Sequence, residues 1–237
     1  MERISVAMAV YNGEKYIKDQ VDSILKQLRE NDELIISYNE SNDKTWKILQ
    51  NYRHNRKVKI YICKEKGVTS NFSNAIRKSK GDYIFLSDQD DVWEDNKVET
   101  VMKAFKKANC DLVLHNAKYT DSKLNDTGLT LFSKRGEKTG VIHTILKNCF
   151  QGCCMAFKKD VKQYIFPIPK SVPMHDQWIG ILASTFGKIE IVNDCLIKYR
   201  VHETNTSQDG LPVLQKITTR LFLLYQYLIR LFSLIIK

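Results

Sequence analysis

The strongest constraint on the fold is an alternation, from residue 3 to residue 108, of short apolar runs with longer amphipathic segments. The apolar runs show little polar alternation, which is typical of strands buried on both faces of a parallel sheet. They lie at 3–12, 33–39, 57–64 and 81–87. The other segments carry apolar residues at helical spacing, and they lie at 14–28, 43–54, 68–80 and 96–108. This pattern predicts an α/β fold with a doubly wound, mostly parallel, Rossmann-like sheet, in which ligands bind at the carboxyl ends of the strands.

The second half of the chain is less regular. We expect, in order, a strand at 110–121, an irregular polar loop at 128–140, a helix at 141–149, a strand leading into a helix at 152–160, a proline-rich loop at 166–173, a helix at 175–187 and one or two strands at 188–202. The composition shifts sharply at Val213, after a polar stretch. We therefore predict one domain over 1–207, followed by a linker and a helix over 208–237.

The charge balance limits the choice of partners. Lysine and arginine number 37 against 27 acidic residues, for a net charge of +10, which indicates an anionic partner. No nucleic-acid-binding motif accompanies this charge, so we expect no nucleic acid. The six cysteines have no disulfide-scaffold spacing, which predicts buried thiols in a reducing cytoplasm. We expect no signal peptide and no transmembrane helix, because no run of about 18 apolar residues occurs.

Three carboxylates, Asp88, Asp90 and Asp91, follow the apolar run at 81–87 in the sequence "SDQDDVW". Like charges this close repel one another, so a positive partner is expected. A divalent cation that also binds a diphosphate would fill this role. The alternative is a solvated acidic turn that caps the helix at 96–108.

Four segments in order resemble the inverting glycosyltransferases of family 2, which have the GT-A fold. The segments are "VAMAVYNGEKYIKDQVDSIL", "GDYIFLSDQDDVW", "MHDQW" and "YRVHETNTS". The resemblance covers roughly residues 4–206, and "SDQDDVW" with "YRxHxxN" is similar to a subgroup that contains many bacterial rhamnosyltransferases. It implies a nucleotide-sugar donor, linked to UDP or dTDP, and Mn²⁺ or Mg²⁺ as cofactor.

The resemblance implies roles for the residues of the donor and metal sites. Asp90 is the expected metal ligand, and His202 completes the metal site unless it is a surface histidine. Asp88 is expected beside the donor ribose. Arg200 is placed to face phosphate. Tyr11 either stacks on the pyrimidine or packs against the sheet.

Donor-base recognition departs from the family pattern. Relatives have an acidic pair where this chain has Tyr38 and Asn39. The amide oxygen of Asn39 is able to accept a base N–H, although less strongly than a carboxylate. Asn71 either contacts the base or is exposed on its helix. A catalytically weak relative that acts as a binding or scaffold subunit is the alternative function.

A second set of residues concerns catalysis and the acceptor. The resemblance implies that Asp176 is the general base, against the alternative that it only caps a helix. His175 tunes that base or contacts the acceptor, and Asp91 fixes its loop or approaches acceptor or sugar. Gly152 permits close approach of a ligand or makes a tight strand entry. Trp178 stacks on a sugar or packs in the core.

The segment 213–237 predicts an amphipathic basic helix. Its cations are Lys216, Arg220, Arg230 and Lys237, with no acid, and its apolar face is wide. A helix on an anionic membrane surface fits this pattern, and packing on its own domain or on a second copy is the alternative. The sequence thus predicts an enzyme on the inner face of the plasma membrane, which moves a sugar, with rhamnose as candidate, to a lipid-linked or polysaccharide acceptor in bacterial surface glycan synthesis.

Overall fold

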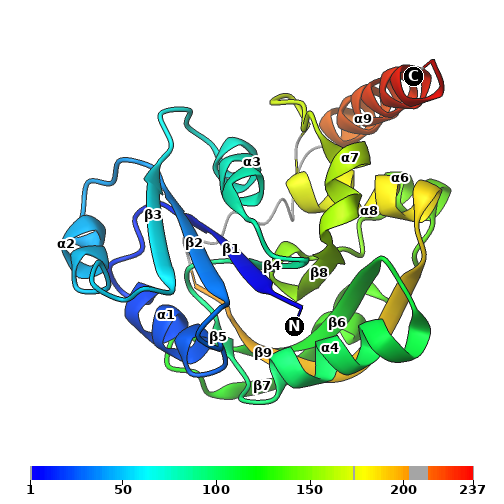
Figure 1. Cartoon of the computed structure of the whole chain (residues 1–237). Helices are drawn as coiled ribbons and strands as arrows, with labels where there is room; N and C mark the ends of the chain where they lie inside the picture. The colour runs from blue at the N-terminus through cyan, green and yellow to red at the C-terminus, as the bar shows by residue number, and fades with distance from the viewer. Residues whose placement is uncertain (1, 173, 203–212, 237) are drawn as a thin grey trace.

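The structure is a computed structural model that describes residues 2–172, 174–202 and 213–236. Among these residues, one nine-stranded sheet has the order β3-β2-β1-β4-β8-β6-β9-β5, and β7 pairs with β6 (Figure 1). The strands are β1 (Ile4–Val10), β2 (Glu33–Tyr38), β3 (Val58–Ile62), β4 (Tyr83–Ser87), β5 (Val92–Trp93), β6 (Leu112–Thr120), β7 (Asp126–Thr130), β8 (Met155–Lys158) and β9 (Ile189–Arg200).

Helices cover both faces of the sheet. They are α1 (Ile17–Leu25), α2 (Thr45–Gln50), α3 (Val68–Lys78), α4 (Lys97–Ala108), α5 (Leu131–Arg135), α6 (Val141–Leu146), α7 (Lys162–Ile165), α8 (His175–Phe186) and α9 (Val213–Ile235), with short 3-10 turns η1 (Gly152–Cys154) and η2 (Lys159–Val161). Helix α3 packs on β1 and β2, and α1 and α2 lie on the opposite side of these strands (Figure 1).

The first half of the sheet follows the predicted pattern. Strands β3, β2, β1 and β4 are parallel neighbours, and every residue of β2 and β4 is buried. Strands buried on both faces lack polar alternation, which explains the continuous apolar runs of the sequence. The second half is mixed: β8 lies antiparallel between β4 and β6, whereas β9 runs parallel to β6. A doubly wound, mostly parallel sheet is confirmed.

Several local details differ from the expectations or lie outside what the structure describes. The stretch 128–140, expected to be an irregular loop, contains the end of β7 and all of α5. The two-residue strand β5 was not predicted. The predicted domain boundary at 207 and the linker lie outside the described residues. The predicted buried thiols are confirmed for five of the six cysteines, Cys195 being half-buried.

Helix α9 lies against the domain along one face only. The Tyr227 hydroxyl is 3.0 Å from Oγ1 of Thr185 on α8. The Arg230 guanidinium donates to the carbonyl oxygens of Tyr164 and Gln163, each at 2.8 Å. Helix α9 also contacts α6. Packing on its own domain is therefore observed for this face, and among the described residues no helix has both the length and the apolar character needed to cross a bilayer.

Candidate active site

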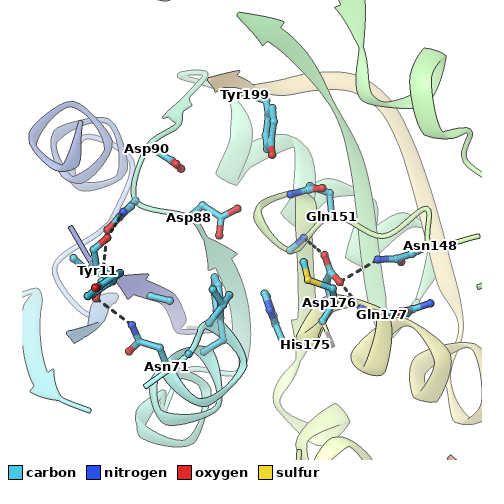
Figure 2. A pocket seen from close by; sticks show the side chains of 18 of the residues that line it. Tyr11, Asn71, Asp88, Asp90, Asn148, Gln151, His175, Asp176, Gln177 and Tyr199 are labelled. Atoms are coloured by element: carbon cyan, nitrogen blue, oxygen red, sulfur yellow. Dashed lines mark hydrogen bonds between the residues drawn. The ribbon is translucent and has the colours of Figure 1, made fainter. Parts of the chain in front are cut away.

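The carboxyl ends of β1, β2 and β4 open onto a cleft of about 1130 Å³. The opposite wall comes from η1 and the start of α8 (Figure 2). This is the edge of the sheet at which the fold is expected to bind ligands. Most of the predicted site residues line the cleft. They are Tyr11, Asn39, Asn71, Asp88, Asp90, Gly152, His175, Asp176 and His202.

Gln89, the central residue of the "DQD" sequence, joins two edges of the cleft. Its amide accepts a hydrogen bond from the Tyr11 N–H at 2.8 Å and donates to the Tyr11 carbonyl at 2.7 Å (Figure 2). A Cβ atom on Gly13 would lie 2.6 Å from Oε1 of Gln89, so glycine leaves room for this clamp. The Tyr11 side chain is 50% exposed, so its ring is available to a ligand. Sequence reasoning missed Gln89 because it treated the central residue as a spacer.

Two buried asparagines lie on the same side of the cleft. The Asn39 amide nitrogen donates to the carbonyls of Cys63 and Glu65, at 2.8 and 2.9 Å. Both amide hydrogens are thereby used, so the group left for a ligand is the acceptor oxygen. The Asn71 amide nitrogen donates to the Val10 carbonyl at 3.1 Å, and its oxygen is buried with no partner among the described residues. Asn39 therefore offers a hydrogen-bond acceptor to a ligand, as the carboxylate implied by the family resemblance would.

Asp90 and His202 meet on the cleft wall. Oδ2 of Asp90 lies 2.9 Å from Nε2 of His202, and the His202 ring packs beside Tyr16 with centroids 4.9 Å apart. Neighbouring ligands of an octahedral Mg²⁺ or Mn²⁺, each about 2.1 Å from the ion, lie about 3 Å apart. Oxygen and imidazole nitrogen are also suitable donors for Mn²⁺. The two side chains therefore fit one divalent cation.

A buried polar cluster lies behind this pair. Ligand atoms of Asp88, Asp91 and Cys153 are within 4.8 Å of one another. Burial, followed by the charges of Asp90 and Asp176, raises the pKa of Asp88 to about 7. Burial likewise raises the pKa values of Asp91 and Cys153.

The chain also brings its own cation to this cluster. Lys97 is fully buried, and its ammonium donates to the Cys153 carbonyl at 2.8 Å and lies over the Trp93 ring. Burial lowers the pKa of Lys97 to about 8. The sequence places Lys97 at the start of an amphipathic helix, where a lysine is usually exposed, so this partner was missed.

Arg200 does not line the cleft, and its expected contact with phosphate needs correction. Arg200 is 3% exposed, and its guanidinium donates to the carbonyls of Asp90 and Ser122, each at 2.8 Å. It also pairs with Asp19 at 3.2 Å. The Arg200 N–H donates to Oδ1 of Asp91 at 3.1 Å. Arg200 therefore holds the acidic loop in place against the end of β9.

Asp176 is oriented by hydrogen bonds to both of its oxygens. Oδ1 accepts from the Asn148 amide at 3.1 Å and from the Gln177 N–H at 2.6 Å, and Oδ2 accepts from the Gly152 N–H at 3.2 Å (Figure 2). The residue before helix α8 is Met174, so Asp176 is not its N-cap. Asp176 is itself buried but, unlike Asp91 and Trp178, it is part of the cleft wall, so these hydrogen bonds fix the orientation of a carboxylate at that wall, as a general base requires. Asn148 was not predicted.

His175 lies beside Asp176 as a neutral ring. It stacks on Phe72 with ring centroids 3.8 Å apart, and neither ring nitrogen has a partner among the described residues. Burial lowers its pKa to about 4. A Cβ atom on Gly152 would lie 2.7 Å from Nε2 of His175, so Gly152 is required by the close approach of this imidazole.

Two predicted contacts with acceptor or sugar are wrong because the side chains are buried elsewhere. Trp178 is completely buried, and its indole N–H donates to the Ile165 carbonyl at 2.9 Å. Asp91 is also completely buried and fixes its loop through Arg200. For both residues the structural alternative weighed from the sequence is the one observed.

Comparison with known proteins identifies the family of the chain. Residues 5–165 match the model of glycosyl transferase family 2. The O-antigen biosynthesis glycosyltransferase WbnJ of Escherichia coli is 29% identical over 228 residues, which cover 89% of this chain and 84% of WbnJ. The UDP-Glc:alpha-D-GlcNAc-diphosphoundecaprenol beta-1,3-glucosyltransferase WfgD of the same species is 26% identical over 219 residues, which cover 90% of this chain and 83% of WfgD.

Solved structures share the fold. TarS 1–349 of S. aureus in complex with UDP has a TM-score of 0.69 at 18% identity, over 84% of this chain and 60% of that one. The mannosyltransferase PcManGT of Pyrobaculum calidifontis, in complex with GDP-Man and Mn²⁺, has a TM-score of 0.66 at 16% identity, over 86% of this chain and 58% of its own. The chain thus spans about 60% of the solved chains that it matches, and 66% of a curated relative from Nostoc. The expected GT-A fold is confirmed, and the chain belongs to glycosyl transferase family 2.

Proposed function

We propose that the protein is a metal-dependent, inverting glycosyltransferase that moves a sugar from a UDP- or dTDP-linked donor to a lipid-linked glycan in bacterial surface polysaccharide synthesis. The observation that carries this proposal is one cleft lined by two sets of groups. The Asp90–His202 pair lies on one wall, and the oriented carboxylate of Asp176 lies on the other. Donor and acceptor would meet between these walls.

The donor half is formed by the ends of the parallel strands. The Tyr11 ring offers a face for a pyrimidine, and Asn39 offers an acceptor for the ring N–H of uracil or thymine. Asp88 lines the same cleft and would contact the ribose. The acceptor oxygen of Asn39 supports retained recognition of the donor base in the absence of the acidic pair.

Asp90 and His202 would hold Mn²⁺ or Mg²⁺ together with the donor diphosphate. When bound, such an ion supplies charge neutralisation for the leaving diphosphate. PcManGT, solved with GDP-Man and Mn²⁺, supports a divalent ion by its fold likeness. Arg200 keeps the Asp90 loop in position through its bond to the Asp90 carbonyl.

Asp176 would accept the proton of the attacking acceptor hydroxyl, which gives inversion at the anomeric carbon in a single displacement. Asn148 and the Gly152 N–H hold the carboxylate in orientation, so proton transfer needs no reorganisation. His175, uncharged next to it, is available to hydrogen-bond the acceptor or the sugar. Rhamnose stays the candidate from the "SDQDDVW" resemblance, and glucose is the sugar in the name of WfgD.

The relatives and helix α9 support the proposed acceptor and location. WfgD acts, by its name, on a diphosphoundecaprenol-linked sugar. Helix α9 presents an exposed apolar face, with Leu221, Tyr225 and Phe232 about 60% exposed. These features support a peripheral enzyme on the inner face of the plasma membrane.

The test is sugar transfer with a donor panel that includes UDP-glucose and dTDP-rhamnose, with and without Mn²⁺. We expect Asp176→Asn to lower the transfer rate at least about a hundredfold while Mn²⁺-dependent UDP binding remains. Asp90→Ala should abolish that binding. Asp160→Asn, at an exposed position, is the matched control. A chain that binds UDP with Mn²⁺ and transfers none of these sugars to any acceptor would be the scaffold subunit instead.

A further inference from the structure

The wall of the cleft next to Asp176 carries a group of cations that neither the donor nor the base uses. They are Lys134 and Arg135 at the end of α5, Lys147 just after α6, and Arg220 on α9. The residues of α5, α6, α9 and the 147–151 segment that line the cleft include no carboxylate. Lys147 and Arg220 have no ion-pair partner among the described residues. Unpaired cations in a cleft indicate an anionic ligand.

The segment from Leu146 to Asn148 connects these cations to the proposed base, Asp176. Asn148 bonds Asp176, Lys147 is the next residue back, and Leu146 lines the cleft while it is 56% exposed. Ile142, one turn earlier on α6, is 76% exposed. The segment therefore leads from the base, through a cation, to an apolar surface.

Helix α9 shows the same order, with a cation at the cleft followed by exposed apolar side chains. Arg220 lines the cleft, and Leu221 beside it is exposed. The exposed side chains of Tyr225, Leu228 and Phe232 extend this apolar face along α9, which projects outward from the domain (Figure 1). Helices α6 and α9 are in contact.

We propose that this wall is the acceptor site for a sugar attached through a diphosphate to a lipid. The sugar hydroxyl lies at Asp176, the diphosphate lies between Lys147 and Arg220, and the first part of the lipid chain lies on the exposed apolar face of α6 and α9. This inference rests on the proposed function and assigns its acceptor to particular residues. A charged diphosphate between a sugar and an alkyl chain matches the order base, cation, apolar surface, whereas a polysaccharide acceptor would use only the first of the three.

Binding of farnesyl diphosphate tests the site without requiring transfer. The wild-type protein should bind it at least about tenfold more tightly than farnesol and than inorganic pyrophosphate, because both the charge and the chain contribute. In Lys147→Ala/Arg220→Ala, affinity for farnesyl diphosphate should fall roughly tenfold or more, with farnesol binding unchanged. The control Arg53→Ala/Lys107→Ala removes the same charge from exposed positions away from the cleft and should have no effect. In Leu146→Ser, the ratio of the affinity for farnesyl diphosphate to the affinity for pyrophosphate should become smaller.

The donor also carries a diphosphate. Competition between UDP and farnesyl diphosphate therefore shows whether the cations bind the donor or the acceptor. Saturating UDP with Mn²⁺ should leave farnesyl diphosphate bound at its own site. Displacement by UDP would overturn the proposal, because the cations would then belong to the donor site. Equal binding of farnesyl diphosphate by the wild type and the Lys147→Ala/Arg220→Ala variant would also overturn it. Failure of all sugar transfer, with this binding pattern intact, would contradict the proposed enzyme activity and leave the anion–lipid site standing.

Discussion

Asn39 illustrates how the surrounding structure defines what a side chain can offer a ligand. The family resemblance implies a carboxylate at this point, and the sequence alone suggests a weakened base site. In the structure, the two N–H groups of Asn39 are used by the carbonyls of Cys63 and Glu65, which fixes the amide with its oxygen as the free acceptor. The loop at 63–65 is thus adapted to an amide, and a carboxylate would face two carbonyl oxygens there.

Restoring the family acid should therefore be harmful. We expect Asn39→Asp to lower the free energy of unfolding by about 2–3 kcal/mol. Two buried hydrogen bonds are lost, and the new carboxylate faces two carbonyl oxygens that carry partial negative charge. Urea denaturation of the two proteins measures this difference. Asn42→Asp, at an exposed position of the same loop, is the control and should change stability by less than about 0.5 kcal/mol. Unchanged stability with tighter UDP binding in Asn39→Asp would contradict the prediction.

His175 should make stability depend on pH. Burial lowers its pKa to about 4, from about 6.5 in the unfolded chain, so between these values the unfolded state binds a proton that the native state does not. Protonation of this histidine therefore does not affect the free energy of unfolding above pH 6.5. As the pH falls from 6.5 toward 4, the unfolded state gains the proton first and the free energy of unfolding decreases. At pH 5 the decrease amounts to about 2 kcal/mol, which His175→Gln should abolish.

Urea denaturation gives the free energy of unfolding of the wild type and of His175→Gln at pH 7 and pH 5. The effect of His175 is the change between the two pH values in the wild type minus the same change in the variant. That design removes the opposite contribution of Asp88, whose raised pKa favours the native state as the pH falls. His54→Gln, at an exposed site, is the control. The same loss of stability in the variant as in the wild type would show that His175 is not the source.

At the scale of elements, periodicity predicts most helices and strands because burial imposes it. It fails where burial is slight: β7 has an exposed, polar sequence and, among the described strands, pairs with β6 alone, so no apolar pattern marks it. The cleft residues were predictable where a motif ends a strand, as at Asp90. Gln89, Asn148 and Lys97 act through contacts between distant segments, 56 to 78 residues apart for Gln89 and Lys97, which no local pattern records.

The clamp between the ends of β1 and β4 should control donor affinity. In Gln89→Ala both hydrogen bonds to the Tyr11 backbone are lost, so the Tyr11 ring is less well placed for a base. We expect the Kd for UDP with Mn²⁺ to rise about five- to tenfold, with little change in melting temperature. Titration calorimetry measures the Kd. Gln163→Ala, at an exposed side chain on α7, is the control, and a Kd unaltered by Gln89→Ala would show that the clamp is dispensable.

For the whole molecule, the position of α9 changes how membrane association must be tested. One face of the helix is packed, with Leu223 fully buried and Tyr227 bonded to Thr185, and Arg220 lines the cleft. Deletion of 213–237 would therefore expose core side chains and alter the cleft at the same time. Substitution on the exposed face separates membrane binding from these effects.

Phe232 and Ile236 are 68% and 80% exposed at the outer end of the chain. If α9 lies in the membrane interface, these side chains are buried in lipid, and each contributes about 1.5–3 kcal/mol. Phe232→Ser/Ile236→Ser should thus lower partitioning onto anionic phospholipid vesicles about a hundredfold, measured by co-sedimentation, with the melting temperature unchanged. Ile62→Ser, at an equally exposed apolar residue of β3, should leave partitioning as it was. Equal partitioning of the double variant and the wild type would exclude this face as the membrane contact and favour a second copy of the chain as its partner.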